Sequence, residues 1–236
     1  MTEPRAAPRN GLLARLPPDA LARLAPDLEP IALVAGQVLH DAGSSPGHVV
    51  FPLAGIVSLQ YLTEAGGCAE IAQVGNDGVI GVALFMGGES TPGRAVVRAA
   101  GQALRLPAAQ LKTEFKRHAE LHVALLRYTQ ALLTQMAQTA ICNRHHQIDQ
   151  QLCRCLLLSL DRVTGSTLAL TQELLAQLLG VRREGVSQAA AKLQREGAIR
   201  YTRGRIVVLD RARIEALSCE CYRVVRRETE RLAALE

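Results

Sequence analysis

The chain has 236 residues, of which 48% are hydrophobic and 21% charged, so it can bury a core and is not disordered. It carries 27 Lys and Arg against 22 Asp and Glu, and its aromatic content of 3% disfavours proteins that bind nucleic acid by stacking bases on aromatic rings. The apolar runs are far shorter than the ~20 residues of a membrane span, and Met1–Arg5 begin no apolar signal segment. We therefore expect a cytoplasmic protein with no membrane partner.

The start of the chain predicts short helices, and the stretch after it predicts β-strands. Residues 10–27 predict one or two short helices, interrupted by Pro17, Pro18 and Pro26. Short β-prone runs punctuated by glycines then recur about every ten residues, which is typical of an antiparallel sandwich or roll. The runs are 31–34, 48–51, 56–62, 70–74, 95–98 and 103–106.

A long helix follows, because residues 119–146 contain neither glycine nor proline. Its apolar positions recur every three or four residues, which predicts one apolar stripe. A small roll cannot cover a stripe of that length, so we expect a second copy of the helix to do so; packing on the chain's own domains is the alternative. The expected dimer seam is Leu121, Leu125, Tyr128, Leu132, Met136 and Thr139.

Residues 172–191 fit a helix-turn-helix. Thr171 is placed to cap the first helix, and Leu175 and Leu179 face inward one turn apart. Ala176 is small where a second helix crosses, and Gly180 suits a tight turn between helices. A second apolar helix, 148–163, precedes this motif.

The second helix of the motif begins with side chains that can read base edges. Arg pairs with guanine, Glu accepts from cytosine and Gln pairs with adenine. Residues 198–209 then predict a β-hairpin, a wing whose Arg203 and Arg205 would contact phosphates. Between Arg182 and Arg213 there are nine basic and three acidic residues, net +6, as a phosphate backbone requires. The expected DNA-binding residues are Thr171, Arg182, Arg183, Glu184, Ser187, Gln188, Lys192, Arg203 and Arg205.

Taken in order, these features resemble the Crp/Fnr family of bacterial transcription regulators, over about residues 12–235. The pattern Gly36-x-Val38-Leu39-x-x-x-Gly43 is similar to the family's first roll strands, and Arg183-Glu184 and Gln188 fall on its base-reading positions. The resemblance implies an α+β fold with a cyclic-nucleotide-binding-like β-roll (jelly roll) at 1–118, a dimerisation helix at 119–147 and a winged helix-turn-helix at 148–236. It also implies a homodimer, double-stranded DNA with a near-palindromic operator, and RNA polymerase as a partner.

The resemblance further implies an effector pocket in the roll, at Gly81, Val82, Arg94 and Ala95. Family members that bind cyclic nucleotides have a glutamate where this chain has Val82, and a serine where it has Ala95. A ribose hydroxyl facing Val82 would lose its acceptor, so we expect no control by cyclic AMP or GMP, and the effector stays unknown. Many members have Arg where this chain has Gln188, so the operator should differ from the usual half-site.

The six cysteines and the histidines predict no metal and no cofactor. The family's iron–sulfur sensors need clustered N-terminal cysteines, and here only Cys68 precedes residue 142. Cys153 and Cys155 point apart on a helix, and so would Cys219 and Cys221 if the last helix, 211–235, is continuous. His118 and His122 could share an ion, but no further ligand has a compelling spacing.

The alternative function is a cupin-like metal enzyme on the β-roll. Such an enzyme needs two histidines close together on one strand, with a carboxylate and a later histidine. His40 and His48 are eight residues apart, and Gly43, Pro46 and Gly47 lie between them. We therefore expect no enzyme activity.

Overall fold

The computed structural model describes residues 10–234, so the sequence interpretation of Met1–Arg5 and the predicted helix end at Leu235 lie outside the described part. Contacts divide the chain into two compact units. The first unit consists of the chain up to Val57 together with Val74–Thr129. The second unit consists of Ser58–Gln73 together with the chain from Gln130 onward. Within residues 10–234 no helix is long and apolar enough to cross a membrane.

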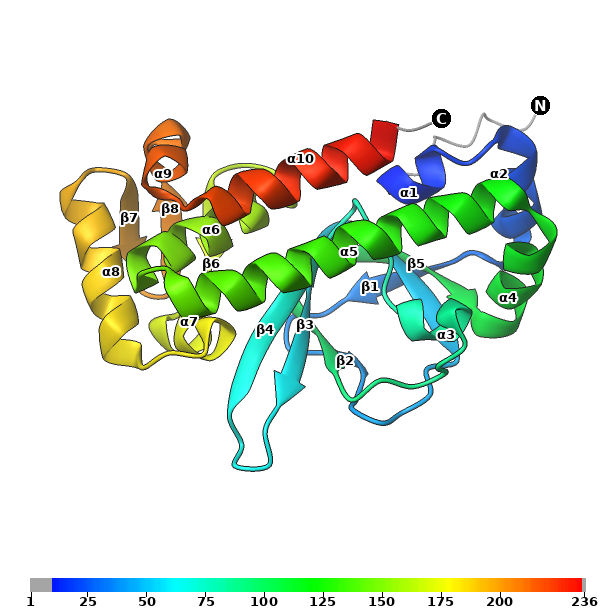
Figure 1. Cartoon of the computed structure of the whole chain (residues 1–236), viewed down its shortest axis with the longest axis horizontal. Coiled ribbons are helices and arrows are strands. Elements are labelled where there is room, and N and C mark those ends of the chain that lie inside the picture. Colours follow the sequence, from blue (N-terminus) through cyan, green and yellow to red (C-terminus); the bar gives the residue numbers. More distant parts are fainter. Residues whose placement is uncertain (1–9, 235–236) are drawn as a thin grey trace. The chain divides into compact units, whose positions relative to one another are not determined.

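The first unit is built on antiparallel strands (Figure 1). The sheet order is β1-β5-β3-β4, with β2 also paired to β5. Its elements are α1 (Gly11–Ala14), α2 (Pro18–Leu24), the 3-10 turn η1 (Ala25–Asp27), β1 (Glu29–Leu33), β2 (Val38–His40), β3 (His48–Leu62), β4 (Cys68–Val74), α3 (Val82–Met86), β5 (Arg94–Pro107) and α4 (Ala108–Arg117). The end of β3, from Ser58 onward, and all of β4 except Val74 count with the second unit.

Two predicted strand breaks at glycines are wrong, because β3 and β5 each run unbroken through the predicted gap. Gly55 of β3 has φ +92, and a Cβ there would meet the Ala99 carbonyl oxygen at 2.5 Å. A Cβ on Gly101 of β5 would meet the Ala54 carbonyl oxygen at 2.1 Å. These glycines allow two backbones to approach closely, instead of turning the chain.

The long helix α5 (Ala119–His145) agrees with the predicted 119–146 and passes from the first unit into the second. The other elements of the second unit are α6 (Ile148–Leu160), β6 (Thr167–Ala169), α7 (Gln172–Leu179), α8 (Arg183–Arg195), β7 (Ile199–Thr202), β8 (Arg205–Val208), α9 (Arg211–Leu217) and α10 (Glu220–Ala234). A three-stranded sheet, β6-β8-β7, packs with the helices on one apolar core centred on α6.

The prediction of one continuous last helix is wrong. The chain leaves helical geometry at Ser218, which has ψ 154, and a new helix begins at Glu220. This break changes where Cys219 and Cys221 point.

Candidate DNA-binding site

Helix α7 begins and ends where the sequence predicts. Thr171 is its N-cap, and its hydroxyl oxygen accepts a hydrogen bond from the Leu174 N–H at 3.1 Å. Gly180 ends the helix in the left-handed region, with φ 66, and the Val181 N–H donates to the Ala176 carbonyl at 3.0 Å. This glycine cap lets the chain reverse into α8 within three residues.

The two helices pack through small and branched side chains. Ala176, where the sequence analysis expects the second helix to cross, is buried in one core together with Val186 and Ala190 of α8. The Ser187 hydroxyl donates to Gln172 Oε1 at 2.7 Å and so ties the start of α7 to α8. Ser187 is half-buried, and its hydroxyl already has a hydrogen-bond partner within the chain. The other residues predicted to read bases are exposed.

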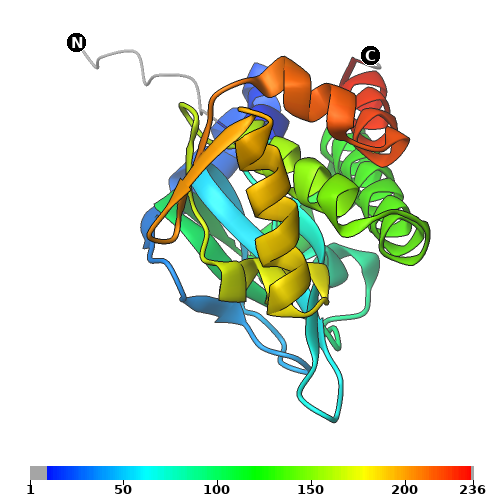
Figure 2. The same cartoon turned by 90° about the vertical axis from the view of Figure 1, so that its left-hand side faces the viewer.

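Figure 2 faces α8 and the β7–β8 hairpin, which lie side by side. The exposed residues of the first two turns of α8 and its N-cap are Arg182, Arg183, Glu184 and Gln188. The Tyr201 N–H donates to Gln194 Oε1 at 2.8 Å and fixes the hairpin to α8. The side chains predicted to read bases and the hairpin arginines thus lie on adjacent elements that a hydrogen bond joins.

The hairpin turn is a two-residue type I′ turn at Arg203-Gly204, whose φ values are 48 and 76. A Cβ on Gly204 would lie 3.0 Å from Thr171 Cγ2, so the hairpin tip lies against the N-terminus of α7. Arg203 and Arg205 are exposed there. A non-glycine residue at positive φ costs about 1 kcal/mol or more, and such strain concentrates at functional positions.

Lys192 is exposed on the next turns of α8, but its ammonium forms an ion pair with Asp149 of α6. The hydrogen bond from Lys192 holds the pKa of Asp149 below its usual range, and the same bond raises the pKa of Lys192. The Asp149 carboxylate thus partly neutralises the charge that Lys192 places on α8.

Comparison with known proteins agrees with this geometry. The family model described as the Crp-like helix-turn-helix domain matches residues 150–217, which are α6 to α9. Its match covers the capped α7, the glycine turn, α8 and the wing. The chain therefore contains a Crp-like helix-turn-helix domain at residues 150–217.

Solved structures show the same fold over most of the chain. A putative Crp/Fnr-family regulator from Eubacterium rectale is 17% identical, with a TM-score of 0.69, and the match covers 87% of this chain and 96% of that one. FixK2 from Bradyrhizobium japonicum is also 17% identical, with a TM-score of 0.69 over 81% and 98% of the chains. A CRP/FNR-family regulator from Thermus thermophilus is 24% identical, with a TM-score of 0.65 over 80% and 98%. No curated protein matches the sequence significantly.

The predicted dimer seam needs correction, because most of its side chains are buried within the chain. Leu121 and Leu125 belong to the apolar core of the first unit, with Tyr128 packed against it. In the second unit Leu132 and Thr139 are also buried. The sequence predicts an apolar stripe on the helix but cannot tell which surface covers it. In the structure, most of the predicted stripe is buried inside the chain itself.

The predicted effector residues are placed at two chain segments of the first unit. Gly81 has φ 100 and precedes α3, whose first residue, Val82, packs against the apolar core. Arg94 and Ala95 begin β5, and Ala95 is fully buried. An apolar side chain thus stands at position 82, and no hydroxyl is present at position 95.

The histidine pair His118 and His122 does not share a site. His118 Nε2 lies 3.0 Å from a Glu114 carboxylate oxygen and its Nδ1 contacts Arg23, while His122 stacks on Phe115 at 4.2 Å between ring centroids. Cys153 and Cys155 are buried in the core, as predicted. The cluster missed by the sequence analysis is Cys142, His146, Cys219 and Cys221. To find this cluster, the sequence analysis would have had to predict the helix break before α10, which lets Cys219 and Cys221 point to the same place.

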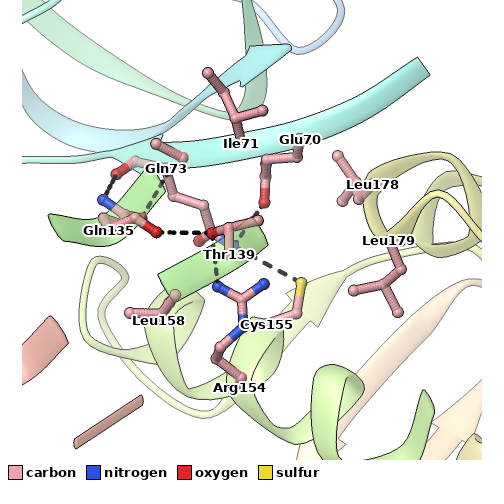
Figure 3. Close-up of a pocket in the computed structure, with 11 residues that line it drawn as sticks. Glu70, Ile71, Gln73, Gln135, Thr139, Arg154, Cys155, Leu158, Leu178 and Leu179 are labelled. Carbon is pink, nitrogen blue, oxygen red and sulfur yellow. Dashed lines mark hydrogen bonds between the residues drawn. The ribbon is translucent and has the colours of Figure 1, made fainter. Parts of the chain in front are cut away.

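Within the second unit, a buried polar cluster connects β4, α5 and α6 beside the end of α7 (Figure 3). Gln135 accepts from the Gln73 N–H at 2.9 Å and donates to its carbonyl at 3.2 Å. The Gln73 amide donates to Glu70, and Arg154 donates to Thr139. Leu178 and Leu179 line the same small cavity, so the α7 end rests on this hydrogen-bonded layer.

Proposed function

We propose that the chain acts as a homodimeric, sequence-specific transcription regulator that reads DNA with α8 and holds phosphates with the β7–β8 wing. One observation carries this proposal. The exposed side chains of Arg183, Glu184 and Gln188 stand on a helix fixed beside a wing that presents Arg203 and Arg205. Base-edge readers and phosphate contacts of this kind act together in winged helix-turn-helix proteins.

The strained tip supports a phosphate role for Arg203. Asn or Gly would adopt φ 48 at lower cost, yet an arginine occupies the position. Its charge and that of Arg205 lie near the N-terminus of α7, where Thr171 is exposed. Helix N-termini attract phosphate through their free N–H groups and dipole.

For the homodimer we propose a different face of α5 from the predicted seam. Its exposed apolar positions are spaced by seven or by three and four, as a two-helix seam requires. They are Val123, Leu126, Leu133, Ala137 and Ala140, with Ile141 beside them. Leu133 is 57% exposed and Leu126 46%, so a second copy of the helix would remove large apolar side chains from water.

The assignment of roles follows the predicted division of the chain. Residues 1–118 sense a signal, 119–147 form the dimer helix and 148–236 bind DNA.

Neither Val82 nor Ala95 can replace the polar partners of a cyclic nucleotide, which supports control by another effector or none. We further propose a cytoplasmic protein that contacts RNA polymerase. A cupin-like enzyme has no support, and we propose that the chain is not an enzyme.

The test is selection of DNA sites with the purified full chain, followed by footprinting of the selected site. We expect protection of a near-palindrome whose half-sites lie about one helical turn, ~10 base pairs, apart. Recovery of sites without two-fold symmetry would contradict the dimeric reading. No enrichment above random DNA would contradict sequence-specific binding.

A further inference from the structure

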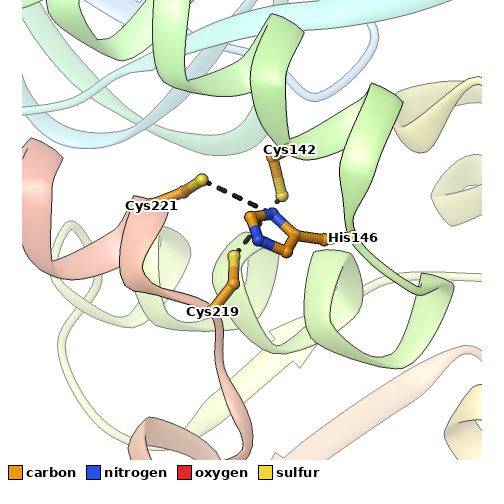
Figure 4. Close-up of side chains that lie close together, drawn as sticks. All are labelled: Cys142, His146, Cys219 and Cys221. Carbon is orange, nitrogen blue, oxygen red and sulfur yellow. Dashed lines mark hydrogen bonds between the residues drawn. The ribbon is translucent and has the colours of Figure 1, made fainter.

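Three thiols and one imidazole converge between the end of α5 and the start of α10 (Figure 4). The four possible ligand atoms all lie within 4.8 Å of one another. Cys142 Sγ is 3.6 Å from Cys219 Sγ, and Cys221 Sγ is 3.6 Å from His146 Nδ1. All four residues belong to the second unit.

We propose that these four side chains form a structural zinc site, with one tetrahedral Zn²⁺ bound by Cys142, His146, Cys219 and Cys221. Three thiolates and one imidazole are a frequent ligand set of structural zinc. With Zn–S about 2.3 Å and Zn–N about 2.0 Å, the edges of such a tetrahedron are about 3.5–3.8 Å long. The Cys142–Cys219 and Cys221–His146 separations of 3.6 Å therefore already correspond to its edges.

The backbone presents the ligands in two pairs. Cys142 and His146 are one helical turn apart, and the His146 N–H donates to the Cys142 carbonyl at 3.0 Å. Cys219 lies in the gap between α9 and α10, and Cys221 is in the first turn of α10. Because the chain is not helical at Cys219, two residues that would point apart on one helix reach the same point.

The second ring nitrogen of His146 has its own partner. Its Nε2 lies 3.4 Å from a Glu220 carboxylate oxygen, while Nδ1 faces the sulfurs. Histidine ligands of zinc are commonly held in this way by a carboxylate on the other nitrogen. The Gln151 amide donates to the His146 carbonyl at 2.9 Å and fixes the turn that follows α5.

Burial and charge agree with a closed site. The three cysteines are buried and form a small cluster of their own, apart from the main apolar core, and the His146 side chain is only 15% exposed. Three thiolates and Zn²⁺ leave one net negative charge. The buried guanidinium of Arg154, which donates to Thr139 one turn before Cys142, supplies a nearby positive charge.

A single ion fits this geometry better than an iron–sulfur cluster. A cluster places several irons and bridging sulfides between its ligands, so its protein sulfurs stand farther apart than those around one ion. The bound ion would join the end of α5 to the start of α10. Its ligands Cys142 and Cys219 are 77 residues apart in the sequence.

The test is metal analysis of the full chain, purified without a histidine tag and with a thiol reductant. We expect one zinc per chain by mass spectrometry, and an X-ray absorption spectrum that fits three sulfurs and one nitrogen. His146→Ala and Cys221→Ser should lose the zinc. The matched variants His145→Ala, next in the chain and exposed, and Cys153→Ala, buried elsewhere, should keep it.

Cobalt substitution of the wild-type chain keeps the test independent of variant folding. The intense visible bands of tetrahedral cobalt thiolate should appear at one equivalent and disappear when zinc is added. Zinc retained by His146→Ala and Cys221→Ser, no metal after purification with added zinc, iron in its place, or a Cys142–Cys219 disulfide in reduced-buffer preparations would each overturn the proposal.

Discussion

Leu132 and Leu133 are adjacent in α5, yet one is 5% and the other 57% exposed. A step of one residue rotates a side chain by about 100° around a helix, so neighbours face different surroundings. Leu132 is buried inside the chain, whereas Leu133 belongs to the exposed stripe that we assign to the partner helix.

Substitutions at these two leucines should therefore change different properties: one the oligomeric state, the other the stability of the folded chain. Leu133→Lys should place two charges at the seam and yield folded monomers, as measured by light scattering at micromolar concentration. Leu132→Ala should instead lower the free energy of unfolding by about 2–5 kcal/mol, because it leaves a cavity. A dimer that survives Leu133→Lys and Leu126→Lys together would show that this face is not the seam.

Replacements on α8 and the wing should separate base reading from phosphate binding. Arg183→Ala or Gln188→Ala should cost about 1–3 kcal/mol and relax preference at one position of each half-site. Arg205→Ala should weaken binding to all sequences alike and lower the slope of log affinity against log salt by roughly one. Binding assays with single-base operator variants at several salt concentrations decide this, and an Arg183→Ala protein with unchanged base preference would refute the assignment.

The Asp149–Lys192 pair predicts a link between stability, pH and DNA affinity. The pKa of Asp149 is lowered in the folded chain, so its contribution to stability is present above its unfolded pKa of about 3.9 and is lost as pH falls through the folded value. Asp149→Asn should flatten the acid side of the stability curve, measured by urea unfolding between about pH 5 and 2.

The same substitution releases Lys192 on α8. Asp149→Asn should therefore raise affinity for all DNA sequences and increase the salt slope, whereas an Asp149→Asn, Lys192→Gln double variant should not. Unchanged binding in the single variant would remove Lys192 from the set of DNA contacts.

Gly180 should resist substitution because of its backbone and not for lack of space. Its φ is 66, and among the described residues a Cβ would meet the Ala69 methyl at 3.6 Å, which is an ordinary contact. Gly180→Ala should destabilise the chain by about 1 kcal/mol or more, and Gly180→Asn by less, since Asn tolerates the left-handed region. Thermal unfolding of both variants checks this order; equal melting temperatures would contradict it.

Cyclic AMP and cyclic GMP should give no heat of binding at micromolar concentrations. Each polar partner missing at Val82 and Ala95 would cost a bound nucleotide about 1–3 kcal/mol. A low-micromolar dissociation constant by calorimetry for either nucleotide would show that other residues of the first unit supply the contacts.

The sequence alone determined the local features of this protein. The Thr171 cap, the Gly180 turn and the alternation that ends in the wing depend on residues within a few positions of one another, so their patterns are visible along the chain. The tertiary structure decided which surfaces meet. Leu121 and Leu125 pack inward, while Leu126 and Leu133 stay exposed. The sequence could not decide this, because the two stripes on this helix look equally apolar in sequence. The tertiary structure also brought Cys142 and His146 to Cys219 and Cys221, because a non-helical residue between α9 and α10 and a packing contact over more than 70 residues leave no periodic signal.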